Sequence, residues 1–126
     1  MALVRISALK DFRAAALSTT DVSTGYNLGA PVAGQVLYGG LHVTNASLGT
    51  TARVLSMAIQ SASSSAFGGV VTRVTFSLST VLGAEWATPV SALSTDQQWW
   101  RANWTLSTVA GSTGGTWKGL IWMGLR

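Results

Sequence analysis

Charged side chains are scarce in this chain, and their scarcity is its strongest compositional signal. Eight Lys and Arg residues and four Asp and Glu residues make up 10% of the 126 residues, against about a quarter in a typical soluble domain. Hydrophobic residues account for 48%. Because a domain of this size leaves much of its surface exposed, so few charges cannot coat an isolated molecule. The composition therefore predicts a subunit whose surface is largely covered by other protein.

Three further absences narrow the class of protein. The chain contains no cysteine, which excludes a disulfide framework and a cysteine metal site. No run of about 18 apolar residues is present, so no membrane helix and no membrane partner are expected. Arg5, Lys10 and Asp11 interrupt the early apolar residues, so no signal peptide is expected.

Residues for catalysis are equally sparse. The single histidine, His42, sits in an apolar stretch, and no Gly-x-Ser-x-Gly motif occurs, so nothing singles out a nucleophilic triad. The four acids are spread along the chain, at Asp11, Asp21, Glu85 and Asp96. The segment GSTGGTWK (111–118) lacks the Gly-Lys-Ser/Thr ending of a phosphate loop and is typical of a hairpin turn. We expect no enzyme activity, no metal and no cofactor.

Segments that alternate apolar and polar residues dominate the rest of the chain. They predict strands over residues 35–44, 52–60, 70–80, 85–90, 98–109 and 116–125, with turns at 45–49 and 111–115 and a loop at 61–69. Residues 1–20 fit an extended N-terminal arm or an edge strand. The sequence therefore predicts an all-β protein with one domain over residues 1–126. The expected architecture is a jelly-roll-like β-sandwich of seven or eight antiparallel strands.

The predicted strands also indicate which faces are buried. In residues 70–80 we expect Val70, Val74, Phe76 and Leu78 to point inward and Arg73 outward. In residues 98–109, Trp100, Ala102, Trp104 and Leu106 share one face.

The last strand is apolar on both faces, with Trp117, Ile121, Met123 and Leu125 on one and Leu120 and Trp122 on the other. Because a two-sheet fold buries only one face of each strand, the second face needs a partner.

These patterns define a candidate interface. The six Trp residues are interpreted as core and subunit contacts, with sugar-binding platforms and base stacking as the other possible roles. Only Arg101 and Lys118 are basic neighbours of these rings, so no direct nucleic-acid partner is expected. The predicted interface combines the basic N-terminal residues with an aromatic group: Arg5, Lys10, Arg13, Trp99, Arg101, Leu120 and Trp122.

Three segments carry a resemblance to a known family. They are AAALSTTDVSTGYN (14–27), LYGGLHVTNASLGTTARVLSMAIQ (37–60) and QWWRANWTLS (98–107). Together they resemble the head decoration, or cement, proteins of tailed bacteriophages. The resemblance implies a non-enzymatic homo-oligomer, often a trimer, on the capsid exterior of the virion. It would be made in the host cytoplasm and would bridge neighbouring copies of the major capsid protein.

Two alternatives remain open. One is a carbohydrate- or receptor-binding module of a tail fibre or a lectin, and the other is a structural subunit of the tail or connector.

Overall fold

The computed structural model describes residues 5–14, 17, 21–47, 55–78, 83–91, 93, 96–106 and 116–126. Over these residues the chain forms strands and no helix, in two antiparallel sheets. The nine strands are β1 (Arg5–Asp11), β2 (Asp21–Val22), β3 (Tyr26–Asn27), β4 (Leu37–Ser47), β5 (Leu55–Ala62), β6 (Val71–Leu78), β7 (Gly83–Trp86), β8 (Trp99–Leu106) and β9 (Thr116–Leu125). No helix of the described residues is long and apolar enough to cross a membrane.

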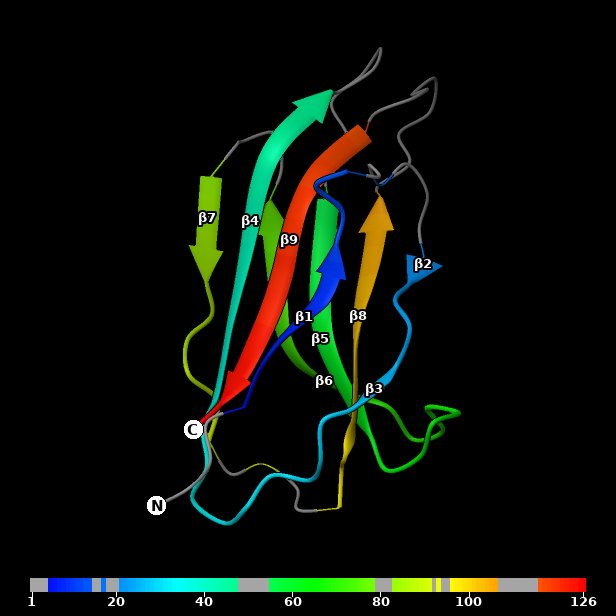
Figure 1. Ribbon diagram of the computed structural model, residues 1–126, viewed down its shortest axis with the longest axis vertical. Coiled ribbons are helices and arrows are strands. Elements are labelled where there is room, and N and C mark those ends of the chain that lie inside the picture. Colours follow the sequence, from blue (N-terminus) through cyan, green and yellow to red (C-terminus); the bar gives the residue numbers. More distant parts are fainter. Residues whose placement is uncertain are drawn as a thin grey trace.

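The two sheets form two layers. The first has the strand order β1-β9-β4-β7, and the second has the order β2-β8-β5-β6, with β3 also paired to β8. In Figure 1 the first sheet lies in front and β6, β5 and β8 lie behind it. β4 and β9 are the central pair of the first sheet, in register from Leu37 opposite Leu125 to Ser47 opposite Thr116.

One core lies between the layers because both sheets turn an apolar face inward. Leu41 and Ile121 from the first sheet and Met57 and Trp100 from the second belong to one buried cluster. In β8 and β9, one of the two predicted faces is the one buried in the core. Among the residues whose side chains are described, it consists of Trp100, Ala102, Trp104, Trp117, Ile121, Met123 and Leu125. The predicted all-β class is therefore correct.

Two expectations about strand limits are wrong. A turn was expected at 45–49, yet β4 continues through Asn45–Ser47, because β9 offers partners as far as Thr116 and a bulge after Val43 restores the register. The strand expected over 85–90 begins at Gly83 and ends at Trp86. Beyond it, Ala87 donates one backbone hydrogen bond to Gly39 of β4, and Val90 exchanges two with Leu37. Residues 48–49, 52–54, 79–80, 107–109 and 111–115 lie outside the described residues.

A second bulge, in β6, overturns two expectations about faces. Val74 is opposite Ile59, but Thr72 is opposite Gln60, so Arg73 is an extra residue in the ladder. Beyond this bulge Val70 is 38% exposed and does not point inward. Arg73, expected outward, instead donates from its guanidinium to the hydroxyl of buried Ser61.

The N-terminal residues form an edge strand. β1 pairs antiparallel with β9, and Leu9 and Phe12 are completely buried in the core. Leu17 continues this edge through a bridge to Trp117. Of the two possibilities for residues 1–20, the described residues form the edge strand, since their apolar side chains belong to the core. Residues 1–4, 15–16 and 18–20 lie outside the described part.

Candidate interaction surface

Two tryptophans meet on the outer face of the first sheet. Gly40 in β4 is opposite Trp86 in β7 and opposite Trp122 in β9. Residues directly opposite one another in neighbouring strands point to the same face. The two indoles therefore flank Gly40, with their ring centroids 5.2 Å apart and their planes at 72°, an edge-to-face contact.

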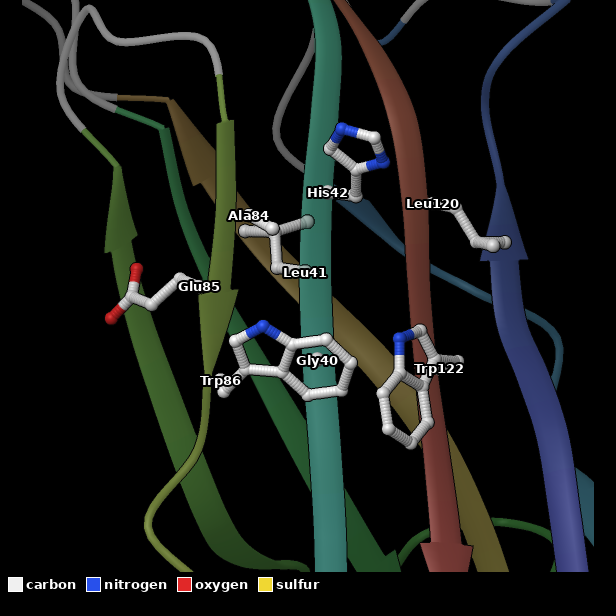
Figure 2. Close-up of a pocket in the computed structure, with 8 residues that line it drawn as sticks. All are labelled: Gly40, Leu41, His42, Ala84, Glu85, Trp86, Leu120 and Trp122. Carbon is white, nitrogen blue, oxygen red and sulfur yellow. The ribbon is translucent and has the colours of Figure 1, made fainter.

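Gly40 allows this contact because it has no side chain. A Cβ atom at this position would lie 2.6 Å from Nε1 of Trp122 and 2.7 Å from two further atoms of its indole. Figure 2 shows Gly40 between the two rings. Trp122 is half-buried because it lies against β4. Trp86 packs against its ring but remains 70% exposed.

Apolar side chains extend this surface. Tyr38, two residues before Gly40 in β4, is 40% exposed, and Leu120, two residues before Trp122 in β9, is half-buried. Tyr38, Gly40, Trp86, Leu120 and Trp122 are called the aromatic patch below. A shallow groove of about 200 Å³ crosses it, and its other lining residues include His42 and Ala84 (Figure 2).

On the β1 side, the acid at the border of the aromatic patch is paired with a base. Asp11 in β1 is opposite Leu120 and forms an ion pair with Arg13, at 2.6 Å between Oδ2 and the guanidinium. Hydrogen bonds from the Arg13 side chain, and secondly from its backbone, lower the pKa of Asp11 from 3.8 to about 2. The acid next to the patch therefore stays ionised and paired at neutral pH.

The predicted interface residues do not form one surface. Leu120 and Trp122 lie together in the aromatic patch, whereas Trp99 and Arg101 lie on β8 in the second sheet.

The N-terminal residues are held within the chain. The Lys10 ammonium lies over the Trp104 ring, 5.6 Å from its centroid, and Arg13 is paired with Asp11. Arg5 is opposite Leu125 in the backbone ladder, and its side chain is outside the described part.

Arg101 also has partners within the chain. Its Nε donates to Oε1 of Gln60 at 2.9 Å, and its guanidinium lies 4.3 Å from the centroid of the Phe67 ring. Phe67 has a positive φ of 54°, which is unusual for a bulky residue and costs backbone strain. The segment that follows β5 thus holds an aromatic ring over Arg101.

Sequence reasoning missed three members of the aromatic patch, namely Tyr38, Gly40 and Trp86. The alternation of Leu37, Leu41 and Val43 on the inner face places Tyr38 outward, and this signal was available in the sequence. No comparable signal marks Trp86. A large aromatic residue in a strand is ordinarily assigned to the core, and its exposure depends on the position of β7 at the edge of the sheet.

The same face shows no arrangement for catalysis within the described residues. His42 is exposed, and its imidazole forms no hydrogen bond with an acid or a hydroxyl of those residues. No group of three or more His, Asp or Glu side chains gathers in the described part of the chain.

No known family model, curated protein or solved structure matches the chain. The class of the molecule is therefore defined by its own geometry. It is an all-β protein of two antiparallel sheets, with an exposed aromatic patch on the outer face of one of them.

Proposed function

We propose that the chain is a non-enzymatic structural protein of a virion, a capsid decoration subunit. It self-associates, as a trimer, and bridges neighbouring copies of the major capsid protein on the capsid exterior. The single observation that carries this proposal is the aromatic patch, where Trp86 is 70% exposed beside a second indole on an outer sheet face. Contiguous exposed apolar surface of this kind is typical of a site of association with other protein.

The strand order supports a class of fold that virion proteins use. β2 and β3 both pair with β8, so we interpret them as one interrupted strand. The eight strands that remain have the order β1-β9-β4-β7 in one sheet and β2-β8-β5-β6 in the other. We infer that this arrangement is a jelly-roll β-sandwich, an architecture found in viral capsid and lectin domains.

The size of the outer face supports a protein partner. The strands β1, β9, β4 and β7 of this face have 7, 10, 11 and 4 residues. With strands about 4.8 Å apart and a rise of about 3.3 Å per residue, the face covers on the order of 500 Å². A stable protein–protein interface buries about 800 Å² on each partner, so this face supplies much of one side. Repetition of such contacts around a shell would give avidity beyond that of one contact.

The proposal assigns self-association to the aromatic patch, and so retains Leu120 and Trp122 from the predicted interface. It remains a prediction that the other residues of the predicted interface contact a partner, namely Arg5, Lys10, Arg13, Trp99 and Arg101. Lys10, Arg13 and Arg101 would have to bind a partner while keeping, or exchanging, the contacts they already make.

The test compares two exposed tyrosines. Tyr38 is 40% exposed in the aromatic patch, and Tyr26 is 38% exposed on the other sheet. We expect Tyr38→Ala, like Trp86→Ala, to lower the mass of the oligomer measured by light scattering, and Tyr26→Ala to leave it unchanged. The position of the chain in imaged virus particles tests the decoration role. A location in the tail, or a chain that is always monomeric and absent from particles, would refute the proposal.

A carbohydrate- or receptor-binding module of a tail fibre or lectin is the second candidate. The exposed indole of Trp86 favours it, because sugars stack on such rings. However, a flat platform needs coplanar rings, and the planes of Trp86 and Trp122 are at 72°. Glycan-array binding that disappears in Trp86→Ala would favour this candidate. A tail or connector subunit would instead show ring stoichiometry in electron micrographs.

A further inference from the structure

The outer edge of β7 has backbone groups that no described strand pairs with. β7 is the last strand of its sheet and pairs only with β4. The backbone N–H of Ala87 donates to the carbonyl of Gly39 at 2.9 Å. Since bonding directions alternate along an antiparallel strand, the backbone of Glu85 also faces β4, whereas the N–H and C=O groups of Ala84 and Trp86 face away from it.

The side chain of Glu85 is the second observation. Its Oε2 atom is buried and has no hydrogen-bond partner among the described residues. Glu85 lines a cleft of about 310 Å³ between the edges of β7 and β6. Figure 2 shows its carboxylate directed away from the aromatic patch.

The basic residue in this cleft is already engaged elsewhere. Arg73 also lines the cleft, but its guanidinium donates to Ser61 at 2.9 Å and to Oε1 of Gln97 at 3.0 Å. A buried carboxylate oxygen without a partner is costly and calls for an explanation.

We propose that the edge of β7 binds an extended segment of a partner protein that carries Lys or Arg opposite Glu85. Ala84 and Trp86 would exchange backbone hydrogen bonds with that segment, which extends the sheet by one strand. Glu85 would then occupy a non-hydrogen-bonded position, where opposite residues are closest, about 4.5 Å between Cα atoms. The basic side chain of the partner segment enters the cleft. The residue next to it in that segment points to the outer face, where the exposed indole of Trp86 covers it.

Symmetric pairing with a second copy of β7 does not supply the cation. In the central antiparallel register, Glu85 would be opposite Glu85 of the other copy, and like charges at opposite positions destabilise a sheet. The adjacent registers with correct bonding directions place Glu85 opposite Gly83 or Ala87. A second copy of β7 is therefore not the occupant, and the proposal takes the segment to come from a different protein. The inference rests on the proposed function only in taking this protein to be the capsid subunit that the chain decorates.

The experiment uses capped seven-residue peptides of alternating Thr and Val, with Lys, Gln or Glu at the central position. Each peptide is titrated into the full chain, and binding is followed by tryptophan fluorescence and by the backbone amide signals of Ala84 and Trp86. We expect the Lys peptide to bind about tenfold more tightly than the Glu peptide. Glu85→Gln should abolish this preference, whereas Asp21→Asn, which removes an exposed acid from β2, should keep it.

Several outcomes overturn the inference. They are equal binding of the three peptides, an unchanged preference in Glu85→Gln, and binding that leaves the Ala84 and Trp86 amides unaffected. Glu85→Gln should also raise the thermal unfolding midpoint, because it removes an unpaired buried charge, so a lower midpoint counts against the inference.

Failure here is distinguishable from failure of the proposed function. Normal capsid attachment of Glu85→Gln refutes the docking edge alone. A Lys preference in a chain that is absent from capsids refutes decoration alone.

Discussion

Two neighbouring glycines in β4 allow the core and the aromatic patch to be perturbed separately. Successive residues of a strand point to opposite faces. A Cβ atom at Gly39 would lie 2.6 Å from Cδ1 of Ile59 in the core, and one at Gly40 would lie 2.6 Å from Nε1 of Trp122 in the patch. Gly39→Ala and Gly40→Ala are therefore the same chemical change on opposite sides of one strand.

The expected changes in the free energy of unfolding differ between the two variants. Gly39→Ala overpacks the core, which typically costs about 1–3 kcal/mol, offset in part by the roughly 0.5–1 kcal/mol that replacing a glycine in a strand returns. In Gly40→Ala the indole of Trp122 must move by roughly 1 Å to reach ordinary contact distance. Losing its edge-to-face contact with Trp86 costs about 0.5–1.5 kcal/mol, and replacing glycine in a strand returns about 0.5–1 kcal/mol. The net change for Gly40→Ala should therefore stay within about 1 kcal/mol.

Urea unfolding and light scattering together test this reasoning. We expect Gly39→Ala to unfold at lower urea concentration and to keep the oligomer mass of the wild type. Gly40→Ala should unfold close to the wild type but dissociate at protein concentrations where the wild type is assembled. An intact Gly40→Ala oligomer would refute the assignment of self-association to the aromatic patch.

Two further predictions concern the N-terminal edge. Phe12→Ala should lower the free energy of unfolding by about 3–5 kcal/mol, because its ring is completely buried; a change below 1 kcal/mol in urea unfolding would contradict the edge strand. The pKa of Asp11 lies below its ordinary value of 3.8, at about 2, so its ion pair with Arg13 stabilises the fold above pH 3.8 and is lost as the pH falls through 2. Carboxyl NMR titration should show this midpoint, and Arg13→Ala should return it toward 3.8; identical midpoints in both proteins would exclude the pair.

The sequence alone predicted the strands in which apolar and polar residues alternate regularly. The residues that share a face in β8 and in β9 were predicted correctly, because Trp100 and Ile121 belong to regular two-residue patterns that tertiary contacts reinforce. The N-terminal residues were ambiguous because Leu9 lies at a bulge: β1 skips one position between Ala8 and Lys10. A short amphipathic segment with an irregular period fits a strand and a helix equally well.

The bulges and the patch could not be predicted, for physical reasons. A bulge such as that at Arg73 depends on the partner strand, so residues on both sides of it change face without any local signal. Trp86 and Trp122 are far apart in the sequence and meet only because β7 and β9 lie on either side of β4. Gly40, between them, is recognisable as part of the site only after that pairing is known.

The contacts made by the charged side chains support the expectation that other protein covers part of the surface. Several of the few ionic side chains are already used inside the chain: Lys10 over Trp104, Arg101 over Phe67, Arg73 on Ser61 and Gln97, and Asp11 with Arg13. These contacts reduce the charge available to keep the surface hydrated, while an indole that is 70% exposed remains on an outer face. Extra charge on that face would raise the solubility of the isolated subunit but would have to be desolvated on assembly. The aromatic patch itself contains no charged residue, and the acid at its β1 border is paired with Arg13, so covering this face with protein avoids much of that desolvation cost.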